Sequence, residues 1–151
     1  MTRRLYRRVD PPSGWPEHLT FSAAVRAGNQ LFVSGMTALG PDGRIVAPGD
    51  ICAQARFIYL EKILPVLRAA GGGLEHVVET VEYVTTFDGY KETADVRREV
   101  FGGPPFPAAT GVMVSGLVRK DALIEIAATA VLPARAAAGA SRADRRRREP
   151  S

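Results

Sequence analysis

The chain has 151 residues, of which 46% are hydrophobic and 24% are charged. This length suits one domain that folds without disulfides or metal, and a single cysteine, Cys52, excludes an intramolecular disulfide and a multi-cysteine zinc site. No apolar run reaches the ~18–20 residues of a membrane span, and the N-terminal MTRRLYRRVDPP lacks the apolar core of a signal peptide. We therefore expect a cytoplasmic protein.

The net charge of +4 is concentrated at the two ends of the chain. Residues 1–10 carry a net +3 and residues 134–151 a net +4, which leaves −3 on the body between them. A nucleic-acid surface needs basic residues on a folded face, so this distribution does not favour a nucleic-acid partner. Residues 134–151 lack large apolar side chains, which predicts a disordered tail after one domain at 1–133. A nucleic-acid-binding or partner-binding arm is the alternative.

The hydrophobic pattern predicts six strands and two helices. In chain order they are strands 5–9, 21–27 and 30–34, a helix at about 50–70, a strand at 77–85, a helix at about 90–101, and strands 110–117 and 123–132. Asp50 is the expected N-cap of the first helix, Pro65 is expected to disturb it, and Gly71–Gly73 end it. The order β-β-β-α-β-α-β-β predicts an α+β fold, with a mixed sheet and two helices on one face.

The last predicted strand has two apolar faces. One face suits packing against the helices and consists of Ile124, Ile126, Ala128 and Ala130. The other consists of Leu123, Glu125, Ala127, Thr129 and Val131. Nothing left in the chain would cover this second face, so the pattern predicts an obligate oligomer.

Few residues have the spacing of a catalytic or metal site. His18 and His76 stand alone, so neither a metal nor a cofactor is expected, and Cys52 is interpreted as a packing residue. Glu82 and Glu125 each interrupt an apolar strand and need a partner or a shifted pKa. Either they form ion pairs between subunits or they act as acid or base in a cleft. The candidate partners for such pairs are Arg119, Arg97 and Arg26.

Three segments together resemble the RidA/YjgF superfamily of small enamine/imine deaminases. They are the hairpin AAVRAGNQLFVSGM, the helix DICAQARFIYLEKILPVLRAAGG, and the closing FPAATGVMV and RKDALIEIAATAVL. The similarity covers about residues 20–132. It implies a chorismate-mutase-like α+β fold and a homotrimer with inward-facing sheets, whose three inter-subunit clefts bind a small molecule.

The chain departs from this family at four polar positions. Ala109 replaces the arginine that grips a substrate carboxylate, and Ala127 replaces the glutamate that orients water. Phe21 and Gly111 stand where the family has tyrosine and cysteine. Ser34, Gly35, Thr110 and Glu125 are retained. The resemblance therefore implies a more apolar cleft that suits a larger, neutral substrate.

We thus expect a divergent enzyme of a specialised or biosynthetic pathway that acts on an enamine, imine or enolisable carbonyl compound. Hydrolysis or deamination, tautomerisation and cyclisation are the candidate reactions. The expected catalytic residues are Glu125, Glu82 and Thr110. The expected substrate-binding residues are Phe21, Ser34, Gly35, Met36, Ala109, Gly111, Ala127 and Arg119. The alternatives are a non-catalytic trimeric ligand-binding or chaperone-like protein and, third, an RNA-binding protein or endoribonuclease.

Overall fold

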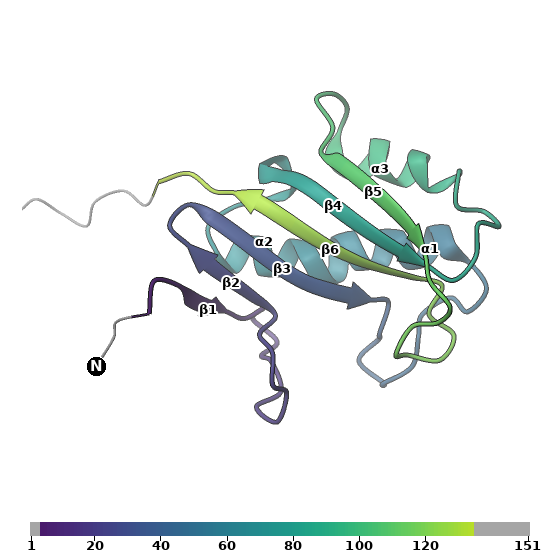
Figure 1. The fold of residues 1–151 in the computed structure, drawn as a ribbon, viewed down its shortest axis with the longest axis horizontal. Coiled ribbons are helices and arrows are strands. Elements are labelled where there is room, and N and C mark those ends of the chain that lie inside the picture. The colour runs from purple at the N-terminus through teal and green to yellow at the C-terminus, as the bar shows by residue number, and fades with distance from the viewer. Residues whose placement is uncertain (1–3, 135–151) are drawn as a thin grey trace, which may run out of the picture.

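A six-stranded mixed sheet forms one layer of the molecule, and the helices form the other (Figure 1). The structure is a computed structural model that describes residues 4–134. Apart from its first residue, the tail predicted at 134–151 therefore lies outside the described residues. The strands are β1 (Arg7–Val9), β2 (Ala24–Ala27), β3 (Gln30–Thr37), β4 (Val77–Val84), β5 (Ala108–Met113) and β6 (Ile124–Val131). Their order across the sheet is β1-β2-β3-β6-β4-β5, and only β4 and β5 run parallel. The predicted α+β fold is confirmed.

The first helix is continuous but changes its hydrogen-bonding pattern. Its parts are α1 (Ile51–Phe57), a π-helical segment η1 (Ile58–Ile63) and α2 (Leu64–Ala69). Asp50 caps it as predicted, because its Oδ1 accepts a hydrogen bond from the Ala53 amide at 2.9 Å. Pro65 lies at the start of α2, where the missing N–H coincides with the change of pattern. Gly71 ends the helix with a φ of 91°.

The short 3-10 helix η2 (Leu74–His76) leads into β4, and α3 (Thr93–Phe101) leads towards β5. All helices pack on the same face of the sheet, behind it in Figure 1. The core between the layers joins Ile58, Ile63 and Leu67 of the first helix to Leu31 and Ile124 of the sheet. The four residues of β6 predicted to face the helices are all buried there.

The largest differences from the predicted strand boundaries are in β2, β3 and β5. β2 begins at Ala24 instead of residue 21, and β3 continues to Thr37 through an irregularity described below. β5 occupies residues 108–113 instead of 110–117, because β4 ends at Val84. The Val84 carbonyl accepts a last hydrogen bond from the Val114 amide at 2.8 Å, and the chain then leaves the sheet.

Gln54 fastens the start of the first helix to the loop before β6. Its fully buried Nε2 donates to the carbonyls of Ala47 and Asp121 at 3.2 and 3.0 Å, and its Oε1 accepts from the Leu123 amide at 2.8 Å. Gln54→Leu keeps the side-chain size but leaves these groups unpaired, so we expect the free energy of unfolding to fall by about 2–4 kcal/mol. Urea denaturation measures this loss. Gln30→Leu, at an exposed site, is the control and should change stability by less than about 0.5 kcal/mol.

Candidate active site

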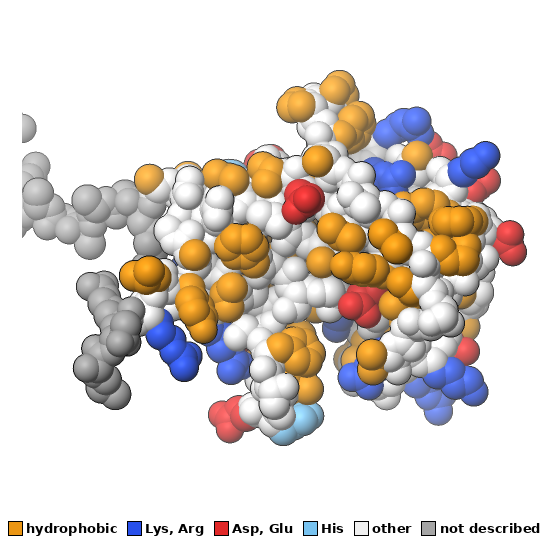
Figure 2. Space-filling view, in the orientation of Figure 1, with side chains coloured by type: hydrophobic (Ala, Val, Ile, Leu, Met, Phe, Trp, Pro, Cys, Tyr) orange, Lys and Arg blue, Asp and Glu red, His pale blue; other side chains and the backbone are white. Residues whose placement is uncertain are grey.

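No element within residues 4–134 covers the face of the sheet opposite the helices. Hydrophobic side chains gather on it, with acidic groups among them (Figure 2). Phe32, Val112 and Val131 are 44%, 38% and 39% exposed, and the neighbouring side chains of β6 are half-buried. We call this surface the open face. It contains the second face of β6, as the alternation of that strand predicts.

A groove of about 400 Å³ lies on the open face, between the end of β4 and the loop after β5. Apart from Glu125, its lining is apolar or glycine with one tyrosine: Gly35, Tyr83, Val114, Gly116, Leu117, Val118 and Ala127. The half-buried Glu125 carboxylate accepts no hydrogen bond from a described residue, and burial raises its pKa above the usual glutamate range. The protonated form of Glu125 is therefore more accessible than that of an ordinary surface glutamate.

A bulge in β3 places Gly35 directly beneath Glu125. The pairing of β3 with β6 shifts between Val33 and Met36, so that the chain gains one residue over its partner strand. A Cβ atom at Gly35 would lie 2.2 Å from Glu125 Oε1. The bulge also reverses the alternation of β3, which turns Met36 into the core with 4% exposure. Met36, which we expect from the sequence among the substrate-binding residues, therefore faces the core and not the groove.

Gly35→Ala is expected to push the Glu125 carboxylate out of the groove. Because the displaced atoms are at the end of a flexible side chain, the carboxylate can turn towards solvent, and its pKa should fall towards the ordinary glutamate value. Carboxyl-carbon NMR titration measures this shift. Gly116→Ala is the matched control, since a Cβ there meets nothing within 4 Å and Gly116 lines the same groove. An unchanged Glu125 titration in the Gly35 variant would contradict the placement.

Glu82 lies on the opposite side of the sheet, under the helices, and is 1% exposed. The phenols of Tyr59 and Tyr90 each donate to its carboxylate at 2.8 Å, and Arg97 Nη1 donates to both carboxylate oxygens at 3.1 and 2.9 Å. Burial raises the pKa of Tyr59, and burial together with Glu82 raises the pKa of Tyr90 to about 12. The ion pair expected for Glu82 therefore forms with Arg97 within one chain, where we expected a pair between subunits.

The two principal departures from the family lie on opposite faces of the sheet. Thr110 and Ala127 are both aligned with Val81 in the ladders of β4, which places them on the open face. Ala109 is aligned with the buried Thr80 and lines a cavity next to α3. A site that used positions 109 and 127 together would need two copies of the chain.

Gly111 also lies on the helix side, aligned with Glu82. A Cβ atom there would be 2.1 Å from the Tyr90 hydroxyl and 2.9 Å from the ring carbon that carries it. The Tyr90–Glu82 hydrogen bond thus occupies the space that a cysteine side chain would need. The absence of cysteine at Gly111 follows from this cluster.

The other predicted binding residues lie outside the groove. Ser34 Oγ donates to the Ser22 carbonyl at 2.7 Å, which fixes the bulge to the segment before β2. Phe21 is 52% exposed and packs edge-on against Trp15, with 5.7 Å between ring centroids. Arg119 lies in the exposed turn before β6, where its carbonyl accepts from the Ala122 amide. The prediction missed Gln54, because it belongs to no recognisable catalytic pattern, whereas Arg97 was among the expected ion-pair partners.

No group of three metal-ligating side chains occurs among residues 4–134. The pKa of the Cys52 thiol is raised, chiefly by burial, and its Sγ lies 3.7 Å from the Gly89 carbonyl. These observations agree with a packing role for Cys52. Within the described part of the chain, no helix combines the length and the apolar composition that crossing a bilayer requires.

Comparisons with known proteins agree with this architecture. The family described as Endoribonuclease L-PSP matches residues 16–132. A RutC family protein of Pyrococcus horikoshii is 38% identical over 110 residues, which are 73% of this chain and 85% of that protein. The 3-aminoacrylate deaminase RutC of Acinetobacter baylyi is 36% identical over 120 residues, 79% of this chain and 93% of that protein.

Among solved structures, a Rid family protein of Yersinia pestis superposes with a TM-score of 0.73 at 30% identity. The match covers 84% of this chain and 99% of that one. The profile match spans well over half of the chain, and the relatives match over most of their own length. The chain therefore belongs to the Endoribonuclease L-PSP family, within the RidA/YjgF superfamily.

Proposed function

We propose that the protein is an enzyme that acts on an enamine, imine or enolisable carbonyl compound, with Glu125 as its acid and base. The observation that carries this proposal is the half-buried Glu125 carboxylate, without a described partner, in an apolar groove. Because its pKa is raised, this carboxyl keeps its proton at a higher pH than an ordinary glutamate does, which favours its use as a general acid. The deaminase activity that the name of the Acinetobacter relative states agrees with this reaction class.

For hydrolysis of an enamine, the protonated Glu125 delivers its proton to the enamine carbon, and an iminium ion forms. The Glu125 carboxylate then takes a proton from the water that attacks the iminium carbon. Glu125 then gives this proton to the nitrogen of the carbinolamine and takes up the hydroxyl proton as ammonia leaves, so that the carbonyl product and the protonated carboxyl are formed. Tautomerisation would use the first proton transfer and then the return of a proton from nitrogen to the Glu125 carboxylate.

The groove supports a neutral substrate near Glu125. Its lining contains no cationic side chain, and Ala127 adds a small apolar surface beside Glu125. A small acid would thus place its carboxylate near another carboxylate without a counter-charge, which is unfavourable. We propose that the enzyme acts in a specialised metabolic pathway, because a larger neutral substrate avoids this unfavourable contact.

The proposed assembly is a homotrimer whose subunits cover the open face of one another. The exposed apolar side chains of the open face need a cover, and positions 109 and 127 reach one cleft only if two chains contribute. Sedimentation of the purified protein tests the assembly. A stable monomer would contradict it.

A direct assay tests the activity. Purified protein is offered enamines with and without a carboxylate, and ammonia release is followed together with solvent deuterium uptake at carbon. We expect faster turnover of the neutral enamines. Preferred turnover of small imino acids would contradict the neutral-substrate proposal, whereas tight binding without conversion would indicate a non-catalytic binding protein. Cleavage of RNA under the same conditions would instead favour the activity that the family description names.

A further inference from the structure

Tyr83 lies beside Glu125 on the open face and lines the same groove. The two residues are aligned in the antiparallel ladder of β4 and β6. Directly opposite residues of such a ladder point to the same side of the sheet, with Cβ atoms about 4.5–5.5 Å apart. Tyr83 and Glu125 are the only polar side chains among the described residues that line the groove. Tyr83 is thus the second polar side chain that a substrate in the groove would contact.

The half-buried Tyr83 side chain has an unused hydroxyl group. Within residues 4–134 this hydroxyl makes no hydrogen bond, whereas those of Tyr59 and Tyr90 both donate to Glu82 on the helix side of the sheet. The Glu125 carboxylate is not its partner either, because burial alone raises the pKa of Glu125. A hydroxyl group that becomes buried without a partner is unfavourable. A substrate that covers the groove therefore has to supply an acceptor for the Tyr83 hydroxyl.

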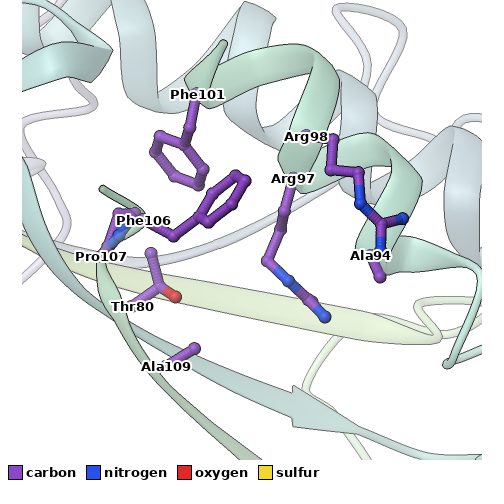
Figure 3. A pocket seen from close by; sticks show the side chains of 8 residues that line it. All are labelled: Thr80, Ala94, Arg97, Arg98, Phe101, Phe106, Pro107 and Ala109. Carbon is purple, nitrogen blue, oxygen red and sulfur yellow. The ribbon is translucent and has the colours of Figure 1, made fainter. Parts of the chain in front are cut away.

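The arginines on the other side of the sheet already have anionic partners. Figure 3 shows Arg97 and Arg98 at a second cavity, of about 240 Å³, which shares no lining residue with the groove. Arg97 is paired with Glu82 at 2.9 Å, and Arg98 is paired with an exposed aspartate. An anionic substrate group beside Glu125 would thus find no unpaired cation in the lining of the groove. The uncharged phenol of Tyr83 suits a neutral acceptor instead.

We propose that the substrate is an enamine conjugated to a carbonyl group, and that the Tyr83 hydroxyl donates to the carbonyl oxygen. This inference rests on the proposed function, in which Glu125 protonates the enamine carbon. A carbonyl group attached to that carbon brings its oxygen close to the residue beside Glu125. The enamine nitrogen is a poor acceptor, because its lone pair is delocalised into the double bond. The substrate class is therefore the neutral enaminones, together with enamino esters and amides.

The test uses 3-aminocyclohex-2-enone, a neutral cyclic enaminone, and aniline, a planar amine without a carbonyl group. Each compound is titrated into the full-length protein and into Tyr83→Phe, and binding is followed by amide NMR. Tyr83→Phe should raise the Kd of the enaminone by about 3-fold to 10-fold, the usual effect of one neutral hydrogen bond, and that of aniline by less than about twofold. Equal binding of the enaminone to both proteins, or no binding to the unaltered protein, would overturn the proposal.

Two further variants complete this test. Tyr6→Phe is the matched control, since Tyr6 is 50% exposed and lies outside the groove, and it should leave the Kd of the enaminone unchanged. Circular dichroism verifies the folding of each variant. A loss in Tyr6→Phe equal to that in Tyr83→Phe would overturn the assignment of Tyr83.

Glu125→Gln separates this inference from the proposed activity. It should abolish ammonia release from the enaminone, whereas binding should still weaken when Tyr83→Phe is added. Binding that depends on Tyr83 without ammonia release from the unaltered protein would support the carbonyl contact and contradict the proposed activity. Ammonia release with a KM that Tyr83→Phe leaves unchanged would support the activity and overturn the carbonyl contact.

Discussion

Arg97→Leu is expected to lower the free energy of unfolding by about 3–5 kcal/mol, the usual cost of removing one partner from a buried ion pair. Glu82 is 1% exposed, and without Arg97 its carboxylate keeps two phenol donors but loses its only positive charge among the described residues. Urea denaturation at a fixed protein concentration measures the loss, since association contributes to the stability of an oligomer.

Two comparisons separate this effect from simple loss of packing. Arg98→Leu removes an exposed arginine that is paired with Asp95 and should cost less than about 1 kcal/mol. Adding Glu82→Gln to Arg97→Leu removes the unpaired charge and should restore much of the lost stability. If Arg97→Leu were as mild as Arg98→Leu, the Glu82 cluster would not stabilise the fold in the way described.

Glu125→Gln is expected to reduce kcat by about 10²-fold to 10⁴-fold on any substrate that the enzyme turns over, the range for loss of a general acid or base. The amide keeps the shape of the groove but cannot exchange the proton. Glu79→Gln is the matched control, because Glu79 lies on the open face outside the groove and accepts only a 3.3 Å hydrogen bond from Thr129. Similar losses in both variants would contradict the assignment of Glu125.

The pH dependence gives a second readout for Glu125. Burial raises the pKa of Glu125 in the folded protein. As the pH is lowered, steps that need the ionised carboxylate should therefore slow down at a higher pH than they would with an ordinary glutamate. The raised pKa also affects stability, because the ionised carboxylate is less favourable in the folded protein than in the unfolded chain. Ionised Glu125 disfavours folding above its raised pKa, so Glu125→Gln should stabilise the protein at neutral pH. That gain should vanish below about pH 4, where the carboxyl is protonated in both states.

The order of elements and the helix-facing side of β6 could be predicted because they follow from hydrophobic periodicity. The cap at Asp50 and the end of the first helix near Gly71 have equally local causes. The orientation of Glu82 could not be predicted, because its strand is apolar on both faces and the pattern does not say which face meets the helices. Glu82 and Arg97 are also 15 residues apart in the sequence. Their contact depends on the packing of α3 against β4, which the local pattern does not specify.

The cleft was harder to predict than the fold for a related reason. Met36 was expected in the cleft, beyond a strand that was expected to end at residue 34. β3 instead continues to Thr37, and neither Ser34 nor Gly35 by itself indicates the bulge that turns Met36 into the core. Gln54 lies within the family-like AQAR segment, but its three partners come from loops far along the chain. Short-range patterns thus locate strands well, whereas they do not specify the partners of isolated polar side chains.

The extra residue in β3 has a consequence for protein engineering. The alternation of buried and exposed side chains changes at Ser34 and Gly35. Before the bulge the odd-numbered residues of β3 are buried, and after it the even-numbered Met36 is buried. Deleting one of these two residues would realign the strand as a regular ribbon. Met36 would still pair with Ile126 and face the core, but a single residue would then join it to Val33, and the backbone that now lies against Glu125 would be rebuilt.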